Sequence, residues 1–509
     1  MKYGKKTLVL GLLFLISTLN AQVEAPPFIT DSLDIYIENA MKDWQIPGMA
    51  VAIIKDGKVQ KLTTYGVKDL ISKEAVDENT LFMIGSNTKA FTGILMASLA
   101  EQGVLSLDDP IKKWLPHFKL RDPWVAEHLT IADALSHRAG FETFQGDFMV
   151  FDSNLTPNQI IEKYSKLKPT HAFRTKWGYF NVGYMLAGEI VKVATGESWD
   201  KMVKDSIFTP LGMDNTLALS SDIATAKNRT KAHTYNRGKI VEIPYGDIDL
   251  VAPAGSISSS IKDMSIWVKT LLNNGALGTA TVINPDAINT SISPFSIESE
   301  GGHPFNTSYF SLYGLGWGIV DYEEHRVIAH TGGIHGYVTS VTTVPEEGIG
   351  IVILTNTDAN YFYEGLKWDI LDAYLELPRN NYHKPYFEYF KGEKVREYAE
   401  IDSWKAKALS KPKTSVPLKN FVGTYTSEVY GWTKISKEGE VLTMTFQHHP
   451  DLSVNLSHIG DNQFMAAYNN LLYGVSLFPF TVDEDKVTGF TLKLAEFIER
   501  TTYNFKKTE

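Results

Sequence analysis

Cysteine is absent from the 509-residue chain, and this absence removes several kinds of chemistry. Without a thiol, the protein holds no disulfide bond and no thiolate metal site, and it has no cysteine nucleophile. A lipid-modified cysteine is excluded for the same reason. The apolar fraction of 43% and the charged fraction of 21% are typical of globular proteins, so we expect the fold to depend on a packed core.

Long apolar runs are also scarce. The run Leu8–Leu19 has about twelve residues, whereas a membrane-spanning helix needs roughly 20. This run follows the basic segment MKYGKK and precedes Ala21, a small residue suited to cleavage. The pattern predicts a signal peptide at residues 1–21, secretion into a bacterial periplasm, and a mature protein without stable membrane insertion.

An excess of positive charge is missing as well. The chain has 49 Lys and Arg against 59 Asp and Glu, a formal net charge of −10. Removing the predicted leader takes away Lys2, Lys5 and Lys6 and no acid, so the net charge goes from −10 to −13. Nucleic acid is not an expected partner, because phosphate contacts need clustered Lys and Arg. We interpret the acidity as favouring solubility.

The length predicts two or three domains, and residues 22–379 carry the pattern of the largest. Strand patterns occur near both ends of this region, with helical patterns between them. The expected strands are 48–55, 58–65, 336–345 and 350–355, and the expected helices are 32–44, 88–102, 181–194 and 261–272. Early strands that pair with late ones would form one antiparallel sheet flanked by helices. The predicted fold class is therefore α+β with an all-helical subdomain.

The composition and the hydrophobic pattern of the sequence change after about residue 380. Residues 380–417 are charged and aromatic and end in KPKTSVP, which predicts a helical linker. In residues 418–509, apolar side chains alternate with period two, and turn signals occur at Glu438-Gly439 and Gly460-Asp461. This pattern predicts a small all-β, barrel-like C-terminal domain.

Ser86 and Lys89 form a Ser-x-x-Lys pattern at the expected start of helix 88–102. Residues i and i+3 share a helix face, so the amine can reach the hydroxyl, and the helix N-terminus offers backbone N–H groups. A serine nucleophile needs a base, and a lysine serves only where burial or nearby cations lower its pKa. The mainly apolar helix favours such burial. The spacing alone is weak evidence, because it recurs at Ser165, Ser198, Ser259 and Ser410.

Tyr179 and Asn181 lie at the expected start of the next central helix, within WGYFNVGYMLAG. The tyrosine could relay a proton to a leaving group, and the asparagine could hold Lys89 and a substrate carbonyl. The same Tyr-x-Asn spacing occurs at Tyr468-Asn469-Asn470, so a capped helix beside a packed tyrosine remains the alternative.

His330, Thr331, Gly332 and Gly333 come just before the late strand pair. Glycines at this place would let a substrate lie against the strand edge, with a backbone N–H as an oxyanion donor. A lone histidine near a strand is more often structural. A catalytic interpretation is favoured over a structural one because all three patterns occur in order, each at the end of an element.

In this order the motifs resemble those of the serine β-lactamase and penicillin-binding superfamily, which carry S-x-x-K, a second polar triplet and K-T-G. The nearer resemblance is to the branch of class C β-lactamases, D-aminopeptidases and esterases, over roughly residues 30–375. The phrases that carry it are IPGMAVAII, LFMIGSNTKAFT, GVLSLDDPI, LTIADALSHRAG, NVGYMLAGEIV and HTGGIHGY. The C-terminal segment resembles the lipocalin-like domain often appended to such enzymes.

The resemblance implies that Ser86 is acylated, that Lys89 is its general base, and that Tyr179 shares proton transfer with the leaving group. Asn181 and the His330–Gly333 stretch would bind substrate, and the N–H groups of Ser86 and Gly333 would form the oxyanion hole. Water would then release the acyl group. No metal or cofactor is expected.

One departure affects the expected substrate. Where β-lactamases and cell-wall carboxypeptidases of this superfamily usually carry lysine, this chain has His330, which is largely neutral at pH 7 at its ordinary pKa. We therefore expect a secreted serine hydrolase acting on amides, peptides with D-residues, or esters. A β-lactamase, a cell-wall D,D-peptidase, a non-catalytic penicillin-binding or sensor module, and an acyl transferase remain alternatives. No oligomeric state is predicted.

Overall fold

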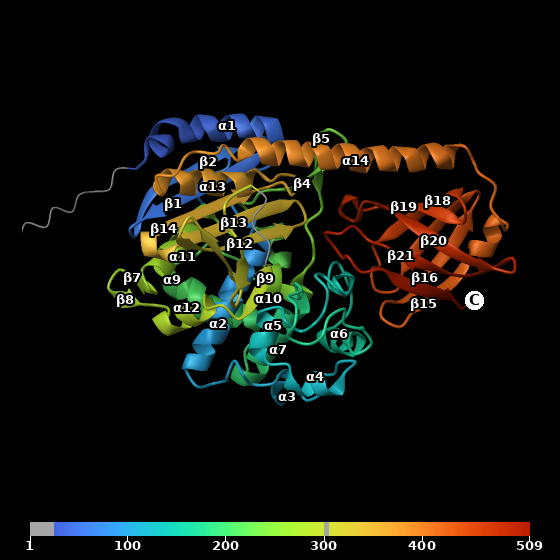
Figure 1. Ribbon diagram of the computed structural model, residues 1–509, viewed down its shortest axis with the longest axis horizontal. Coiled ribbons are helices and arrows are strands. Elements are labelled where there is room, and N and C mark those ends of the chain that lie inside the picture. The colour runs from blue at the N-terminus through green and yellow to red at the C-terminus, as the bar shows by residue number, and fades with distance from the viewer. Residues whose placement is uncertain (1–24, 300–304, 509) are drawn as a thin grey trace, which may run out of the picture.

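The computed structural model describes residues 25–299 and 305–508. The predicted signal peptide at residues 1–21 lies outside the described residues. Figure 1 shows a larger body of sheet and helices, a long helix that leaves it, and a smaller barrel at the C-terminal end. The predicted α+β class with an appended β-barrel is confirmed; the exact domain boundaries stay predictions.

An eight-stranded antiparallel sheet forms the centre of the larger body. In spatial order its strands are β2 (Lys58–Gly66), β1 (Gly48–Lys55), β14 (Ile349–Thr355), β13 (Tyr337–Val344), β12 (His325–Ile334), β11 (Gly318–Tyr322), β10 (Ser311–Tyr313) and β9 (Ser296–Ser299). The early and late parts of the chain meet in this sheet, since Val51 lies opposite Ile353 in an antiparallel pair. Strand β1 is apolar almost throughout because helices cover both faces of the sheet.

Helices α1 (Leu33–Trp44) and α13 (Phe362–Tyr374) cover one face, at the top of Figure 1. The buried residues of α1 recur every three or four positions, so a single apolar stripe faces the sheet. Ile37 from this stripe belongs to the same apolar cluster as Val51 and Leu366. This packing fixes α1 and α13 against the central strands.

The opposite face carries α2 (Thr88–Glu101), α11 (Ile261–Leu272) and the helical subdomain, at the bottom of Figure 1. The other helices are α3 (Ile111–Trp114), α4 (Pro123–His128), α5 (Ile131–Leu135), α6 (Pro157–Tyr164), α7 (Asn181–Thr195), α8 (Trp199–Val203), α9 (Thr209–Leu211), α10 (Ala252–Gly255) and α12 (Pro285–Ser291). Short paired strands in this part are β3 (Phe82–Met83) with β6 (Ser258–Ser259), and β7 (Ala276–Leu277) with β8 (Ala280–Thr281). A further pair, β4 (Ala232–Asn236) with β5 (Lys239–Ile243), lies near the start of the long helix at the top of Figure 1. The junction of sheet and subdomain is where the predicted site residues gather.

A 27-residue helix, α14 (His383–Leu409), runs from the first body to a closed barrel (Figure 1). The barrel strands are β15 (Gly423–Ser427), β16 (Gly431–Glu438), β17 (Val441–Phe446), β18 (Ser453–Gly460), β19 (Gln463–Tyr468), β20 (Val475–Asp483), β21 (Lys486–Leu492) and β22 (Tyr503–Lys507). Alternate residues of these strands point inward, as Leu442, Met444 and Phe446 do in β17. Closure leaves the barrel without free sheet edges.

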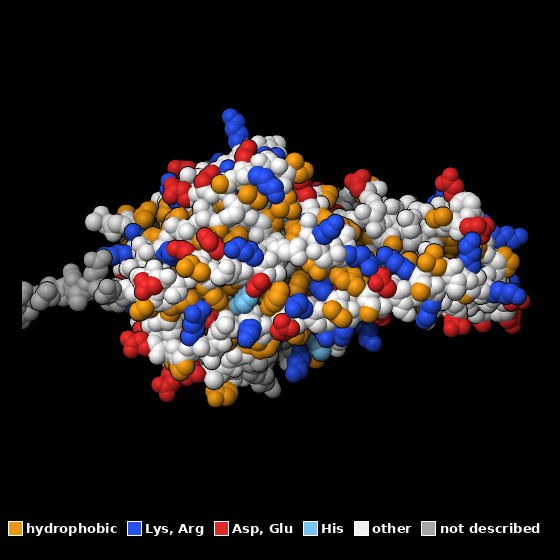
Figure 2. All heavy atoms as spheres, turned by 90° about the horizontal axis from the view of Figure 1, so that it is seen from above, with side chains coloured by type: hydrophobic (Ala, Val, Ile, Leu, Met, Phe, Trp, Pro, Cys, Tyr) orange, Lys and Arg blue, Asp and Glu red, His pale blue; other side chains and the backbone are white. Residues whose placement is uncertain are grey.

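The outer surface is mixed in charge. Figure 2, which views the molecule from the side of α1 and α14, shows acidic and basic side chains interspersed over this face. Within the described residues, no helix combines the length and the apolar character that crossing a membrane requires.

Candidate active site

A cavity of about 530 Å³ opens between the sheet and the helical subdomain. Its lining includes Ser86, Tyr179, Asn181, His330 and Gly333, which come from three separate parts of the sequence. Thr331 also faces this cavity. The structure therefore brings the three predicted motifs together at one place.

Ser86 lies in a turn of 3-10 helix, Gly85–Asn87, that leads into α2, and its side chain is partly exposed. The preceding Gly85 has φ 53°, and a Cβ there would lie 3.0 Å from the backbone N of Gly333. Gly332 is packed more tightly, since its Cβ would lie 1.8 Å from the carbonyl oxygen of Ile84. These glycines let strand β12 lie directly against the turn that carries the serine.

Lys89 lies one turn further along α2 and is fully buried, with 0% of its surface exposed. Its Nζ lies 3.2 Å from Ser86 Oγ, donates to Asn181 Oδ1 at 2.8 Å, and donates to the carbonyl oxygen of Ala254 at 2.7 Å. Burial holds the pKa of Lys89 well below its ordinary value, although the nearby Asp147 acts in the opposite direction. The geometry favours a neutral amine beside the serine hydroxyl.

The ring of Tyr179 packs against the Lys89 amine. Its ring centre lies 4.6 Å from Lys89 Nζ. Burial raises the pKa of Tyr179 above its usual range, and a hydrogen bond with Ser86 opposes the rise. The phenol therefore keeps its proton at neutral pH and can donate it near Ser86.

His137 packs against the ring of Tyr179. Its ring lies 4.4 Å from the Tyr179 ring, and its Nδ1 accepts the backbone N–H of Phe180 at 2.9 Å. The residue has φ 62°, so the turn needs external support. Burial holds the pKa of His137 well below its ordinary value. We assign it a positioning role.

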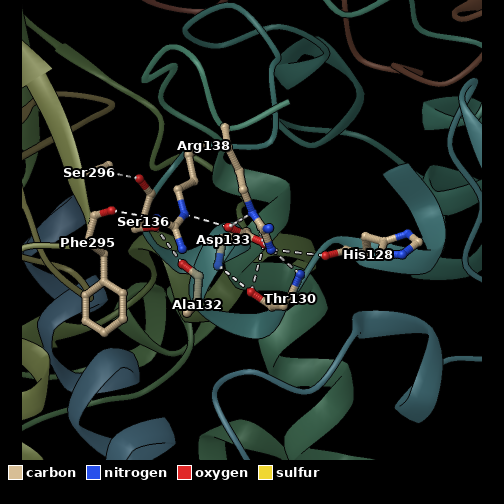
Figure 3. A network of polar contacts seen from close by, with 9 residues as sticks. His128, Thr130, Ala132, Asp133, Ser136, Arg138, Phe295 and Ser296 are labelled. Carbon is tan, nitrogen blue, oxygen red and sulfur yellow. Dashed lines mark hydrogen bonds and ion pairs between the residues drawn. The ribbon is translucent and has the colours of Figure 1, made fainter. Parts of the chain in front are cut away.

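The support for this turn is the ion-pair network in Figure 3. Asp133 is fully buried, and it pairs with Arg138 at 2.5 Å and with Arg174 at 2.6 Å. Arg138 also donates to the carbonyl oxygen of Phe295, and Ser296 Oγ donates to the carbonyl oxygen of Ser136. The network thus links the turn that carries His137 to strand β9.

His330 lies on β12 and is held in its neutral form. Its Nδ1 lies 2.6 Å from the carbonyl oxygen of Thr331, so this nitrogen carries the proton, and Nε2 accepts from Tyr313 Oη at 2.8 Å. Burial lowers the pKa of His330 to about 3. The sequence predicted a largely neutral imidazole at pH 7, and the buried position strengthens that inference.

Replacing His330 with glutamine is expected to make thermal stability less sensitive to acid. The pKa is about 3 in the folded protein and about 6.5 when unfolded, so only the unfolded chain takes up this proton between those values. The stability that His330 contributes is full above pH 6.5 and is lost as the pH falls towards 3. Melting temperatures are measured between about pH 4 and pH 8. As the pH falls, the melting temperature of the wild type should fall further than that of H330Q. Exposed His117→Gln is the control, and the same trend in both variants would contradict the assignment.

Asp147 is a site residue that the motifs did not reveal. It is buried, and its Oδ2 accepts a hydrogen bond from Asn181 Nδ2 at 2.6 Å. Burial raises the pKa of Asp147 to about 8, despite the hydrogen bond from Asn181. The residue begins a short turn of 3-10 helix, Asp147–Met149, and a lone aspartate carries no recognisable spacing. Tyr313, the partner of His330, was missed for the same reason.

The second Tyr-x-Asn pattern does not join the site. Tyr468 and Asn470 lie in the barrel, at the end of β19 and just beyond it. Within residues 25–299 and 305–508, no three His, Cys, Asp or Glu side chains come together in a way that could hold a metal ion.

Comparisons with known proteins agree with this arrangement. A family model described as beta-lactamase matches residues 33–375, more than half of the chain. A second model, described as a domain of unknown function (DUF3471), matches residues 408–508.

Curated relatives are distant. The unguisins hydrolase ungD of Aspergillus violaceofuscus is 28% identical over 429 residues, which cover 78% of this chain and 74% of the relative. Protein flp of Staphylococcus aureus is 27% identical over 332 residues, which cover 65% of this chain and 63% of the relative. The match to protein flp thus spans less than two thirds of that relative's length.

Among solved structures, the octameric penicillin-binding protein homologue from Pyrococcus abyssi superposes with a TM-score of 0.58 at 21% identity. The match covers 93% of this chain and 99% of that chain, so the two share their fold almost from end to end.

Proposed function

Because the chain belongs to the beta-lactamase family, we propose that it is a secreted serine hydrolase that forms an acyl-enzyme on Ser86. The observation that carries the proposal is the fully buried Lys89 amine, 3.2 Å from the Ser86 hydroxyl at the edge of an open cavity. A buried lysine destabilises the folded protein, because burial disfavours its charge, so a catalytic use would account for its presence. The hydrolase name of the fungal relative supports the same reaction class.

Acylation begins with proton transfer from Ser86 to Lys89. A neutral lysine amine has two N–H groups and one lone pair. Asn181 and Ala254 accept the two N–H groups, so the lone pair is left to accept the serine proton. The Ser86 oxygen then bonds to the substrate carbonyl carbon, and the carbonyl oxygen becomes an oxyanion. The N–H groups of Ser86 and Gly333 are the proposed donors to that oxyanion.

Collapse of the tetrahedral intermediate breaks the bond to the leaving group. The Tyr179 phenol delivers a proton to the departing oxygen or nitrogen, and Lys89 returns a proton to the tyrosine. Water then attacks the acyl-enzyme ester and loses a proton to the same pair. The pair passes a proton to the departing Ser86 oxygen, which releases the carboxylic acid and restores the serine hydroxyl.

The cavity favours uncharged groups beside the reacting bond. Neutral His330 supplies no cation to pair with a substrate carboxylate. Apolar side chains, among them Phe144, Phe151 and Ile248, make up much of the remaining lining. We therefore propose esters, or amides and peptides that include D-residues, ahead of β-lactams, whose recognition uses a carboxylate.

The test is a substrate panel applied to the intact protein. It contains a p-nitrophenyl ester, a D-alanyl p-nitroanilide and a chromogenic cephalosporin, and intact mass and peptide mapping follow the acyl group. We expect repeated turnover of the ester or the amide, slow or absent turnover of the cephalosporin, and an adduct on Ser86. The same mass of secreted protein reports whether residues 1–21 are removed.

Other outcomes of the panel identify the alternatives. A single acylation without turnover would indicate a penicillin-binding or sensor module. Fast cephalosporin turnover would indicate a β-lactamase, and amide formation with an added amine would indicate an acyl transferase. An adduct on a residue other than Ser86 would contradict the proposed mechanism.

A further inference from the structure

Glu499 is a buried carboxylate of the C-terminal barrel that reaches into the catalytic body. It lies in the loop between β21 and β22 and is 1% exposed. Its Oε1 accepts the backbone N–H of Gly146 at 2.7 Å, and its Oε2 accepts that of Phe148 at 3.3 Å. The barrel's Tyr430 and Tyr503 donate their hydroxyls to the same carboxylate. These neutral donors offset the cost of burying the group.

The two backbone N–H groups flank Asp147, so the carboxylate fixes the turn that carries this aspartate. Gly146 has φ 89°, and a Cβ there would lie 2.6 Å from Tyr164 Oη, which leaves the turn little freedom. A second barrel residue holds the same turn, since His449 stacks on the Phe148 ring at 3.9 Å and its Nε2 lies 2.7 Å from the Phe148 carbonyl oxygen.

From this turn, hydrogen bonds continue to the nucleophile. Asp147 Oδ2 accepts from Asn181 Nδ2 at 2.6 Å, and Asn181 Oδ1 accepts from Lys89 Nζ at 2.8 Å. The aspartate therefore decides which end of the Asn181 amide faces the lysine. If the turn shifts, the amide is free to rotate and to present N–H groups to an amine that needs an acceptor.

We propose that Glu499 is a positioning residue for the catalytic lysine, acting through the turn at Asp147 and through Asn181. On this proposal the barrel is part of the catalytic unit, because the geometry of the general base depends on a residue that the barrel supplies. The inference rests on the proposed function of Ser86 and Lys89, and it adds a role for the C-terminal domain that the catalytic motifs do not contain.

The test compares Glu499→Ala and Glu499→Gln in the full-length protein. We expect Glu499→Ala to lower kcat for a small p-nitrophenyl ester about ten- to hundred-fold, with KM nearly unchanged, because misplacing a base affects the chemical step. Glu499→Gln should lose less, since its amide oxygen can still accept the Gly146 N–H. The pH profile of acylation should shift more in Glu499→Ala than in Glu499→Gln, as the loss of kcat does.

Tyr473→Phe is the matched control. Tyr473 is another barrel residue; its ring lies edge-on to Phe148, a contact that phenylalanine keeps, and its hydroxyl donates to Asp152 of the catalytic body at 3.1 Å. The substitution removes one partly buried hydrogen bond between the two bodies, so it reports the effect of loosening their contact. We expect its kcat and pH profile to match those of the wild type.

A second measurement does not depend on turnover. The titration of Lys89 is followed by the NMR signal of its labelled side chain, assigned with Lys89→Met. The groups that face Lys89, and whose own titration must be considered, are Asp147, His137, His330, Tyr179 and Tyr184. We expect the Lys89 signal to shift in Glu499→Ala and, less, in Glu499→Gln, but not in Tyr473→Phe.

The outcomes separate this inference from the proposed function. If the wild type turns over ester while both Glu499 variants keep its kcat, pH profile and Lys89 signal, the positioning role is wrong and the hydrolase stands. If the wild type never acylates but the Lys89 signal moves in the variants, the hydrolase is wrong and the positioning role stands. If Glu499→Ala fails to fold, Glu499→Gln decides in the same way.

Discussion

A protein in which Ser86 is replaced by alanine is expected to lose both acylation and turnover, with kcat/KM falling by roughly 10⁴-fold or more. The substitution removes the oxygen that attacks the substrate and leaves the cavity and Lys89 in place. Stability should change little, because Ser86 is partly exposed at the cavity and its hydroxyl fills no packed site. Ester hydrolysis and intact mass after a short incubation measure the two losses.

Ser198→Ala is the control with the same sequence pattern. Ser198 precedes α8 and is followed three residues later by Lys201, but this serine is exposed and makes no capping hydrogen bond. Lys201 is on the surface, where it pairs with Asp205. We expect this variant to keep full activity. If Ser86→Ala remained active and was still acylated, the nucleophile would have to be another residue.

The sheet and its helices could be predicted because their patterns are local. Continuous apolar runs, as in β1, indicate strands buried on both faces, and the stripe of α1 indicates a helix on a sheet. Glycine is the residue that most often ends a helix in the left-handed conformation, and Gly196, with φ 80°, ends α7 in this way. The barrel was predictable from its period-two alternation. The resemblance of residues 30–375 to the β-lactamase superfamily is confirmed by the family model.

The candidate site was only partly predictable. Ser86, Tyr179 and His330 could be found because each belongs to a short pattern at the end of an element, and the structure places them around one cavity. Asp147 and Glu499 belong to no such pattern. Glu499 is 353 residues from Gly146, the residue that it holds, and no spacing rule reaches across that distance.

Burial also limits what a sequence can say about charge. The ordinary pKa of histidine predicts a His330 that is largely neutral at pH 7, but the fall of its pKa to about 3 depends on the burial of the ring in the folded protein. Likewise, the Ser-x-x-Lys pattern cannot show that Lys89 alone among the five such lysines is a buried neighbour of a serine beside a cavity. Those properties arise from contacts between α2, α7 and α10.

Replacing Lys89 with methionine is expected to lower kcat/KM by about 10³- to 10⁴-fold while leaving the protein folded. Methionine is similar in length and apolar, so it fills the same buried space without a base. The remaining groups still bind substrate, and Ser86 must then react without losing its proton to an amine. Ester turnover by purified protein gives the loss of activity, and circular dichroism checks the fold.

The effect of Lys89→Met on stability should depend on pH in a direction opposite to that of an ordinary surface lysine. Burial lowers the pKa of Lys89 in the folded protein, so below the ordinary value only the unfolded chain holds this proton, and the wild type loses stability as the pH falls. Methionine removes that loss but leaves Asn181 Oδ1 and the Ala254 carbonyl without their donor, which costs about 1–3 kcal/mol for each. We therefore expect a melting temperature near or below that of the wild type in alkali, with a relative gain for the variant in acid.

Lys163→Met is the control for the loss of activity in Lys89→Met, because it removes another lysine whose pKa burial lowers. Burial also lowers the pKa of Lys163, but its Nζ donates to the Val429 carbonyl oxygen, away from the cavity. We expect it to keep the activity of the wild type. If Lys89→Met kept kcat/KM within about tenfold of the wild type, the base would have to be another group, and Tyr179 would be the nearest candidate. The raised pKa of Tyr179 argues against that outcome, because a phenol that holds its proton at neutral pH serves as a donor before it serves as a base.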